Sequence, residues 1–352
     1  MAHITLGIIG GGQLGSMLAN AAKKLNIKTI IFCDDQNAPA KNYADKFIYS
    51  DYRDREKIKQ FLELVDVITF EFENIPFDSL NLMNNQKKVL PNPEIIKILQ
   101  NRLLEKDFLS NLNIVTTKYV SIKKKEDLEN NQNLLPGILK TSTLGYDGKG
   151  QFKIFSLNDL KSINVDFKNE YILEKLVKLK KEISVVITRF GNHRYEIYEP
   201  IENYHEDQIL ILKNSKIPAD INKDIVDQSL NWAKLIVEKL NYIGTLCVEY
   251  FLDQNENLYV NEIAPRVHNS GHLTINSHNI SQFENHIRAV CGLEKIETKK
   301  IYNAEMLNIL GNDIIKYRSK KHEDNEYFFD YLKKDIKEKR KMGHITKVFN
   351  NK

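Results

Sequence analysis

The hydrophobic pattern changes its period along the N-terminal part of the chain. Apolar positions are continuous over Ile4–Ile9 and Ile27–Cys33, whereas over Leu14–Leu25 they recur at helical spacing. Two further strand candidates, Lys46–Ser50 and Asp66–Phe72, flank a charged helical stretch. This alternation predicts a parallel sheet with helices on both faces.

Two prolines follow this region. Pro93 suits the first turn of a helix that we expect to run through Leu112, and Pro91 lies just before it. We therefore place the first domain boundary near residue 98.

The pattern beyond this boundary is of a different kind. Longer β segments begin near Ser121, and one long amphipathic helix is expected around Asp224–Leu240. Two strands, Thr245–Leu252 and Leu258–Ile263, flank a polar turn, which predicts a hairpin. The second region is therefore of the α+β class.

Composition and charge narrow the class of protein. A chain of 352 residues, with 42% hydrophobic and 28% charged residues, predicts two or three domains with a large core and excludes a small hormone or a disordered chain. The net charge of +4 is too mild to imply nucleic acid. No stretch approaches the roughly 20 apolar residues that a membrane span needs. We expect a cytoplasmic protein with no nucleic-acid or membrane partner.

The chain has three cysteines, Cys33, Cys247 and Cys291, which lie far apart and lack the spacing of metal ligands. Reduced, buried thiols are expected.

A glycine loop follows the first predicted strand. Gly10–Gly15 reads GGGQLG, satisfies GxGxxG and opens a predicted helix, and Asp34 closes the next strand about 20 residues later. Glycines let an anion approach the backbone, and the amides at the helix start supply donors. The pattern favours a phosphate-bearing ligand, with NAD or a purely structural turn as alternatives.

A second glycine loop follows the predicted strand end Ile138–Lys140. Gly145–Gln151 reads GYDGKGQ, and three glycines with a lysine can fold over polyphosphate while Lys140 provides a fixed cation. The loop is not a GxxxxGK[ST] P-loop, and a mobile surface hairpin is the alternative.

The predicted hairpin places two acids opposite each other. Glu249 and Glu262 are nearly equidistant from the centre of the turn. Opposed like charges repel by roughly 1–4 kcal/mol at about 4 Å, depending on the effective dielectric, so this pair requires a cation. Mg²⁺ holding ATP phosphates would meet that need, and two solvated surface glutamates are the alternative.

A dense run of donors follows Glu262. The segment Ala264–His272 reads APRVHNSGH and has no helical period, which we interpret as an anion-binding loop rather than core. Zinc is not expected, because no third ligand accompanies His268 and His272 at metal spacing.

These motifs, together with Arg102 and the pair Gly343–His344, resemble the 5-(carboxyamino)imidazole ribonucleotide synthases, ATP-grasp enzymes of bacterial and fungal purine synthesis. The string NEIAPRVHNSGH at 261–272 is the most specific element. The resemblance implies a Rossmann-like domain (1–98), an ATP-grasp core (99–295) with a small lid (about 118–174), and a short C-terminal domain (296–352).

The resemblance also implies a reaction. Such enzymes use ATP and bicarbonate to make carboxyphosphate, whose carboxyl group is transferred to the exocyclic amine of 5-aminoimidazole ribonucleotide. The products are the carbamate, ADP and phosphate. Mg²⁺ and a homodimer are expected with it, Arg266 would hold bicarbonate or carboxyphosphate, and Lys140 would serve the phosphoryl transfer.

The residues implied for each ligand are as follows. The magnesium ligands would be Glu249 and Glu262. The ATP contacts would be Arg102, Lys140, Gly145, Tyr146, Asp147, Gly148, Lys149, Gly150, Gln151, Glu174, Lys175, Val177, Glu182, His205, Asn261 and Glu262. The ribonucleotide contacts would be Gly12, Gln13, Leu14, Glu73, His268, Asn269, Ser270, His272, Lys334, Arg340 and Lys341.

The sequence departs from the family pattern at two places. Leu144 stands where a glycine is usual, and Lys337–Lys341 replaces the usual RPGRK. Ala264 replaces the asparagine metal ligand of many ATP-grasp enzymes, as it does in the family.

Three alternatives stay open at this point. The formate-dependent glycinamide ribonucleotide transformylase shares the glycine loop and differs in its acyl donor. An NAD-dependent dehydrogenase would use the first glycine loop but leaves Glu249, Glu262 and the second glycine loop unexplained. A non-catalytic binding protein would not need intact ATP-site residues.

Overall fold

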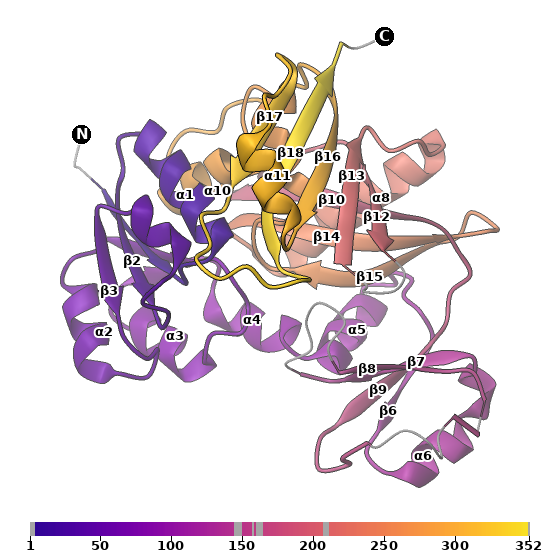
Figure 1. The fold of residues 1–352 in the computed structure, drawn as a ribbon. Coiled ribbons are helices and arrows are strands. Elements are labelled where there is room, and N and C mark those ends of the chain that lie inside the picture. The colour runs from indigo at the N-terminus through magenta and orange to yellow at the C-terminus, as the bar shows by residue number, and fades with distance from the viewer. Residues whose placement is uncertain (1–3, 144–149, 157, 160–164, 207–210, 351–352) are drawn as a thin grey trace.

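The computed structural model describes residues 4–143, 150–156, 158–159, 165–206 and 211–350, which form three sheets with helices packed on them (Figure 1). One sheet lies in the N-terminal region, one large sheet forms the centre, and one small sheet projects from it.

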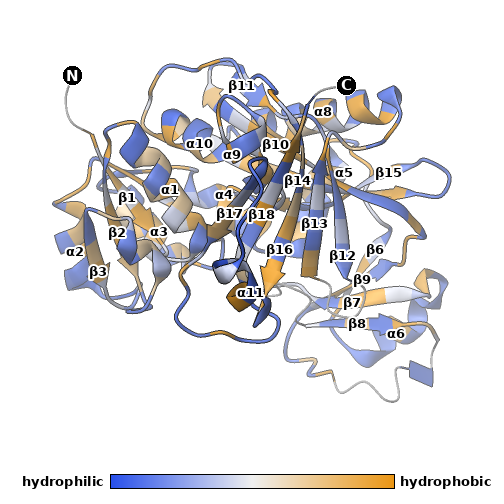
Figure 2. Ribbon diagram, turned by 45° about the horizontal axis from the view of Figure 1, so that its top comes forward, coloured by the Kyte–Doolittle hydropathy of each residue, from blue (hydrophilic) through white to orange (hydrophobic). Residues whose placement is uncertain are grey.

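The N-terminal sheet has five parallel strands in the order β3-β2-β1-β4-β5, which confirms the expected parallel sheet. Its strands are β1 (Thr5–Ile9), β2 (Lys28–Cys33), β3 (Lys46–Tyr49), β4 (Val67–Phe70) and β5 (Lys88–Val89). Its helices are α1 (Gln13–Lys24), η1 (Pro39–Asn42), α2 (Arg55–Leu62) and α3 (Phe77–Asn84). Figure 2 shows hydrophobic strands β1 and β2 and a largely hydrophilic outer helix α2.

Different parts of the chain cover the two faces of this sheet. Helices α2 and α3 pack on one face through Phe61 and Leu80. Helix α1 covers the other face together with α10 (Gln282–Val290), whose Phe283 and Ile287 join the same core. A helix from far along the chain therefore fixes the N-terminal sheet against the central region.

The single helix expected from Pro93 through Leu112 is wrong, because the structure has two helices. These are α4 (Pro93–Leu99) and α5 (Arg102–Asn111). Asn101 is extended, and its side chain accepts hydrogen bonds from the amides of Leu103 (2.9 Å) and Leu104 (3.2 Å). Such an N-cap starts a new helix and makes Arg102 its first residue.

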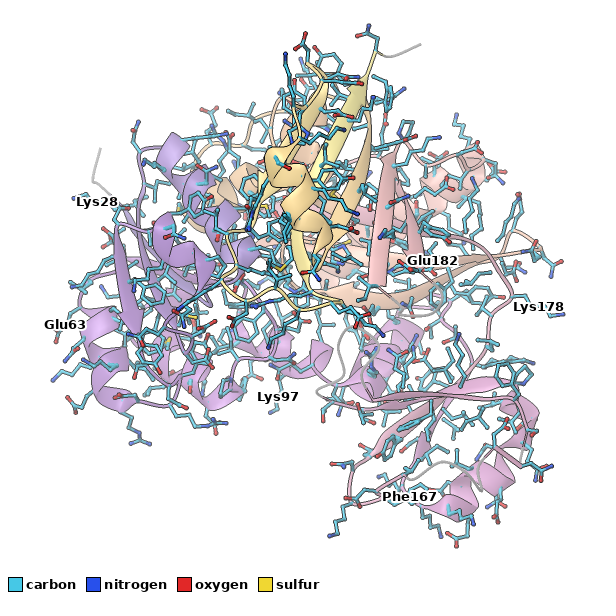
Figure 3. The ribbon with its side chains drawn as sticks, in the orientation of Figure 1. Lys28, Glu63, Lys97, Phe167, Lys178 and Glu182 are labelled. Atoms are coloured by element: carbon cyan, nitrogen blue, oxygen red, sulfur yellow. The ribbon has the colours of Figure 1, made fainter. Side chains whose placement is uncertain are left out.

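The small sheet is antiparallel and has its own core. Its strands run in the order β6 (Tyr119–Ile122), β9 (Tyr171–Lys175), β7 (Gly137–Thr141) and β8 (Gln151–Ile154). The helices beside it are α6 (Lys125–Asn130) and η2 (Gln132–Leu134). Leu128 and Leu139 are buried in this core. Figure 3 shows Phe167 at the far end of this sheet.

The central sheet has nine antiparallel strands in the order β15-β14-β10-β12-β13-β16-β18-β17, with β11 paired to β10. Its strands are β10 (Leu179–Gly191), β11 (Arg194–Ile197), β12 (Ile201–Glu206), β13 (Ile211–Ile217), β14 (Gly244–Asp253), β15 (Leu258–Ala264), β16 (Asn303–Leu310), β17 (Glu326–Asp330) and β18 (Lys341–Phe349). The other helices are α8 (Lys223–Lys239), η3 (Ser270–Leu273), α9 (Thr274–Ser277) and α11 (Asp313–Ser319). The C-terminal strands extend this sheet, since β16 pairs with β13.

The expected amphipathic helix and hairpin are both present, as α8 and as β14 with β15. Helix α8 buries Ala233, Ile236 and Val237 against β10 and β14. The three cysteines are buried and unpaired, as expected.

Replacing Ile236 by alanine should lower the free energy of unfolding by about 3 kcal/mol, because this side chain is fully buried and its removal leaves a cavity. Asn231→Ala, at an exposed position of the same helix, is the matched control. Urea unfolding of both variants checks the prediction, and equal losses would contradict the packing of α8.

Candidate active site

The two predicted acids face each other across the central hairpin. The register of β14 and β15 pairs Glu249 with Glu262, as expected from the sequence. The register then shifts, because Tyr250 pairs with Val260 and leaves Asn261 as an extra residue. Directly paired residues point to the same face of a sheet, so both carboxylates share one surface.

Each of these carboxylates has a cation beside it. Glu249 Oε1 lies 3.0 Å from His268 Nε2, and Glu262 Oε2 lies 3.0 Å from Arg102 Nη1. Burial alone would raise the pKa of the Glu249 carboxyl, but His268, His205 and Arg266 outweigh burial and lower it to about 2. The alternative of two solvated surface glutamates is therefore wrong for Glu249.

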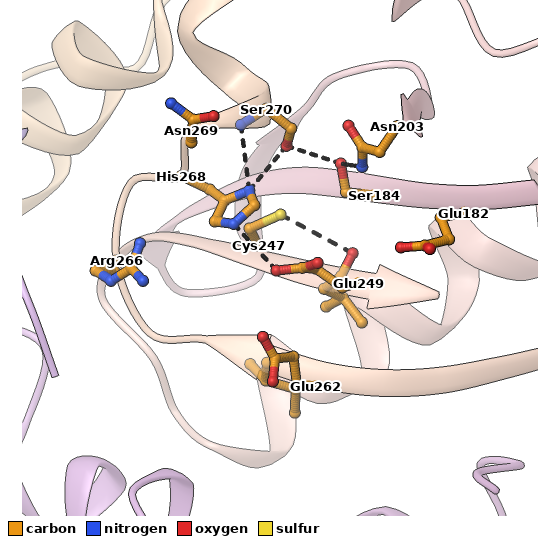
Figure 4. A network of polar contacts seen from close by, with 12 residues as sticks. Glu182, Ser184, Asn203, Cys247, Glu249, Glu262, Arg266, His268, Asn269 and Ser270 are labelled. Carbon is orange, nitrogen blue, oxygen red and sulfur yellow. Dashed lines mark hydrogen bonds and ion pairs between the residues drawn. The ribbon is translucent and has the colours of Figure 1, made fainter. Parts of the chain in front are cut away.

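A buried hydrogen-bond chain fixes the orientation of His268 (Figure 4). Nδ1 of His268 contacts the Ser270 hydroxyl at 2.8 Å, and that hydroxyl contacts the Ser184 hydroxyl at 2.8 Å. Asn203 donates from Nδ2 to Ser184 at 2.8 Å and accepts from the Ser215 hydroxyl at 2.9 Å. The chain holds the imidazole so that Nε2 points at Glu249.

A second group of charges lies between the small sheet and α5. Lys140 Nζ lies 3.1 Å from Glu174 Oε1, and Lys106 Nζ lies 3.6 Å from Glu174 Oε2. The Thr117 hydroxyl donates to Glu174 at 2.9 Å. Burial alone would raise the pKa of Glu174, but Lys140, Lys106 and Arg102 outweigh it and lower that pKa to about 2. Glu174 is therefore a buried carboxylate surrounded by cations.

Three more predicted residues lie where the chain passes from the small sheet into strand β10 of the central sheet, and a fourth, His205, lies on β12. Lys175 is exposed at the end of β9, and Val177 is half-buried. Further along, Glu182 Oε2 lies 2.7 Å from His205 Nδ1. Burial would lower the pKa of His205, but its hydrogen bond and charge interaction with Glu182 raise it. Figure 3 shows Glu182 on the side of the central region nearest the small sheet.

The backbone amides of the first glycine loop bind a buried carboxylate, Glu71, that the sequence analysis missed. Glu71 accepts hydrogen bonds from the amides of Gly12 and, at 2.7 Å, Gly15. A Cβ at Gly12 would lie 2.7 Å from the Glu71 carboxylate, so the glycine is needed for this close approach. The donors that a dinucleotide phosphate would use are already occupied, which argues against NAD. The only signal was an acid near the end of the predicted strand Asp66–Phe72.

Arg266 connects the N-terminal sheet to the central hairpin. Both Nε and Nη2 of Arg266 contact the Glu73 carboxylate, the latter at 3.3 Å, and Nη1 donates to the Val267 carbonyl at 3.2 Å. Burial would lower the pKa of Arg266, but Glu73, Glu249 and Glu262 raise it. The guanidinium therefore stays charged beside the two opposed acids.

The interpretation of Ala264–His272 as an anion-binding loop rather than core is wrong in part, because Asn269, Ser270 and His272 are buried. Asn269 exchanges two side-chain hydrogen bonds with Asn308, at 3.0 and 2.6 Å. Gln282 donates to the His268 carbonyl at 2.6 Å and accepts from the His268 amide at 2.9 Å. Asn308 of β16 and Gln282 of α10 thus provide hydrogen-bond partners for polar groups of this segment within the protein.

His272 lies deepest in this segment. It is 0% exposed and packs near the rings of His344 and Phe283, with centroids 5.1 and 5.4 Å away. Burial lowers the pKa of His272 well below its usual value, so the imidazole is neutral. The structure thus places this residue behind the loop and not on its surface.

The basic stretch near the C-terminus is only partly turned toward these residues. Lys334 is exposed, and Arg340 donates to the Asp335 carbonyl at 3.1 Å. Lys333, which is not among the predicted phosphate contacts, donates to the Lys341 carbonyl at 2.7 Å. Burial raises the pKa of the Glu71 carboxyl, and the charge of Lys333 is one of the groups that oppose this rise. The structure therefore brings Lys333 to the first glycine loop.

Part of the second glycine loop lies outside the described residues, namely Leu144, Gly145, Tyr146, Asp147, Gly148 and Lys149. Gly150 has a φ of +70°, and Gln151 pairs with Lys140 in the register of β7 and β8. The described end of the loop therefore lies beside Lys140.

Three further findings concern metal ligands, a cavity and membrane-spanning helices. Across the described ranges, no group of three or more His, Cys, Asp or Glu side chains is placed to hold a metal ion. A pocket of about 510 Å³ between β5 and the β10–β11 turn contains none of the residues above. In the part of the chain that the structure covers, no helix combines the length and apolar character needed to span a membrane.

Three protein-family models match the chain in sequence order. They are the ribonucleotide synthetase preATP-grasp domain over residues 3–100, the ATP-grasp domain over 107–283, and the phosphoribosylaminoimidazole carboxylase C-terminal domain over 304–352. These matches confirm the expected fold class of a Rossmann-like domain, an ATP-grasp domain and a small C-terminal domain.

Known proteins match over nearly the whole length. The chain is 37% identical to N5-carboxyaminoimidazole ribonucleotide synthase of Staphylococcus aureus strain COL, with 99% of this chain and 93% of the relative covered. The solved S. aureus synthetase complexed with ADP is 36% identical, with a TM-score of 0.91 and 99% and 94% of the two chains covered. The Aspergillus clavatus synthase in complex with ADP and 5-aminoimidazole ribonucleotide is 28% identical, with a TM-score of 0.90 and 99% and 94% covered.

The ion pair of Glu249 and His268 should make stability depend on pH. Burial would lower the pKa of His268, but the Cys247 sulfur and Glu249 raise it from 6.5 to about 10. Because the pKa of His268 is higher in the folded than in the unfolded protein, its protonation stabilises the folded state. This contribution is complete below about pH 6.5 and is lost as the pH rises through about 10. The difference in free energy of unfolding between the wild type and Glu249→Gln should therefore be largest near pH 6 and shrink toward pH 10.

Urea unfolding at pH 6, 8 and 10 measures this difference, with the exposed Glu63→Gln as control. A difference that is the same at all three values would mean that His268 is neutral in the folded protein.

Proposed function

The chain belongs to the N5-carboxyaminoimidazole ribonucleotide synthase family, and we propose on that basis that it carboxylates the exocyclic amine of 5-aminoimidazole ribonucleotide with ATP and bicarbonate. It is an ATP-grasp ligase of purine biosynthesis. The observation that carries the proposal is the opposed pair Glu249 and Glu262 with Arg102 beside it. The two carboxylates can bind a metal cation, and the neighbouring guanidinium can bind an anion such as a phosphate.

The opposed acids fit magnesium. Mg²⁺ prefers oxygen ligands and commonly takes one or two protein carboxylates plus substrate phosphates, so two glutamates without a third protein ligand suffice. Glu249 and Glu262 would hold it, and a bound Mg²⁺ neutralises charge on the transferring phosphoryl oxygens. The low pKa of Glu249 keeps its carboxylate ionised for this purpose.

The ATP phosphates are proposed to contact Arg102, Lys140 and the loop Gly145–Gln151. Arg102 already pairs with Glu262, and Lys140 is nearly buried against Glu174, so both cations have fixed positions before the nucleotide arrives. Fixed charges need no reorganisation when charge develops on the phosphoryl group. The remaining nucleotide contacts are proposed at Glu174, Lys175, Val177, Glu182, His205 and Asn261.

Arg266 is proposed to hold bicarbonate or carboxyphosphate. Its planar guanidinium suits a carboxylate-like or phosphate-like partner, and its charge is maintained by Glu73. Its position between Glu73 and the opposed acids places it between the N-terminal sheet and the proposed ATP site. Exclusion of water by the small sheet would protect the anhydride.

The ribonucleotide is proposed to lie against Gly12, Gln13, Leu14, Glu73 and His268. Asn269, Ser270 and His272 are buried, so we assign them to supporting His268 from beneath. The 5′-phosphate contacts are proposed at Lys334, Arg340 and Lys341. We add Lys333 to this proposal, because it donates to the Lys341 carbonyl and its charge acts on Glu71, which binds the Gly12 amide.

The family resemblance extends the proposal to Mg²⁺ as the metal, to a homodimer and to the cytoplasm. Mg²⁺ is also supported by the opposed acids Glu249 and Glu262, whereas the homodimer and the cytoplasmic location rest on that resemblance alone.

One assay tests the function. ADP release is measured with ATP and Mg²⁺, with bicarbonate and 5-aminoimidazole ribonucleotide added singly and together. The full rate should require both. A rate that needs formate in place of bicarbonate would favour the transformylase, and a melting temperature raised by NAD but not by ATP would favour a dehydrogenase.

Replacing either opposed acid by glutamine should nearly abolish turnover, with a loss of about 100-fold or more at limiting magnesium, because one charge of the metal pair is gone. The change is Glu262→Gln or Glu249→Gln, and Glu199→Gln on the surface is the control. Rates are measured as a function of Mg²⁺ concentration. Near wild-type activity in either variant would show that the metal assignment is wrong.

The basic stretch gives a second prediction. Lys333→Ala and Arg340→Ala should each raise the KM for the ribonucleotide about tenfold and leave the KM for ATP nearly unchanged, because a phosphate contact is lost. Lys334→Ala, at the exposed neighbouring position, should have a smaller effect than Lys333→Ala. If all three variants keep the wild-type constants, the 5′-phosphate is held elsewhere.

A further inference from the structure

Lys106 is an almost fully buried cation that the sequence analysis did not select. Its exposed fraction is 1%, and it lies on α5, one turn after Arg102. Burying an ammonium group is costly unless the group is paired and hydrogen-bonded. The contacts that compensate this cost therefore indicate what the residue does.

One set of contacts reaches the strand that carries Glu262. Lys106 Nζ donates to the carbonyl of Asn261 at 3.0 Å and contacts that of Val260 at 3.4 Å. Strand β15 is the last in the order of the central sheet, so these carbonyls belong to its outer edge. The register shift of the hairpin also falls at Asn261. Lys106 thus holds the strand at its irregular point, directly before Glu262.

The neighbouring residue holds the strand on the other side of Glu262. Glu105 is 2% exposed, and its Oε1 accepts from the amide of Ile263 at 2.5 Å. Adjacent acidic and basic side chains on α5 therefore bind the backbone before and after the proposed metal ligand.

A second set of contacts reaches the small sheet. Lys106 Nζ lies 3.6 Å from Glu174 Oε2 and 3.4 Å from the Thr117 hydroxyl. The other oxygen of Glu174 lies 3.1 Å from Lys140 Nζ. One ammonium group is thereby joined to Lys140 through a single carboxylate.

We propose that Lys106 is a positioning residue that fixes Glu262 on the central sheet and Lys140 on the small sheet relative to each other, for simultaneous contact with metal and phosphates. The inference rests on the proposed function, in which these two groups hold Mg²⁺ and ATP phosphate. Lys106 itself is too deeply buried to be a ligand. It acts through the β15 backbone and through Glu174.

The test replaces Lys106 by methionine, which keeps the length of the side chain and removes its charge. Steady-state kinetics should show a KM for ATP raised about tenfold in Lys106→Met and a KM for the ribonucleotide within twofold of the wild type. Lys295→Met, which breaks the ion pair with Glu196 away from these residues, is the control and should leave both constants unchanged.

A double-mutant cycle separates positioning from general stability. If Lys106 acts through Glu174 on Lys140, its removal should change ATP affinity less than threefold in a Lys140→Ala background. A full tenfold effect in that background, or a lower melting temperature with an unchanged KM for ATP, would overturn the inference.

Thr117→Val provides a milder change should Lys106→Met fail to fold. It removes the hydroxyl that contacts both Lys106 and Glu174 and should raise the KM for ATP about threefold with the ribonucleotide KM unchanged. An unchanged KM for ATP in this variant would also count against the inference. Failure of the proposed function is seen separately, as a wild-type enzyme whose ADP release does not depend on the ribonucleotide.

Discussion

Two like charges on neighbouring strands set the main constraint on this structure. The register of β14 and β15 places Glu249 opposite Glu262, and such a pair is stable only when positive charge is close by. That charge comes from three residues in two places: Arg102 at the start of α5, and His268 and Arg266 in the segment after β15. Helix α5 and the segment after β15 must therefore both lie close to the two acids to supply this positive charge.

The cations are in turn held by a second group of carboxylates. Glu73 binds Arg266 from the N-terminal sheet, and Glu174 binds both Lys140 and Lys106 between the small sheet and α5. Alternating charges thus connect all three sheets. Buried ion pairs are poor sources of net stability, since desolvation offsets much of their attraction. Their value here is a set of charges that are already oriented before a ligand binds.

Local patterns were enough to predict much of the fold and part of the site. The strands of the N-terminal sheet follow from short continuous apolar runs, as expected for strands covered on both faces. Helix α8 follows from a period of 3.6 residues, which buries one face of a helix. The opposition of Glu249 and Glu262 was expected from their nearly equal distance to one turn, and the extra residue Asn261 completes it. The break before α5 was missed because the Asn101 cap interrupts the helix without interrupting its apolar period.

The sequence by itself determined most of the elements, the opposition of Glu249 and Glu262 and the identity of the charged motifs, because these depend on neighbours along the chain. Only the tertiary structure decided that Glu71 fills the first glycine loop, that Lys106 joins two sheets and that His272 is buried. Each of these facts depends on partners that are distant in the sequence or belong to another element. Gln282 of α10, which donates to the His268 carbonyl, is one such partner. The free energy of a buried polar group is set by those partners, and residue spacing along the chain does not reveal them.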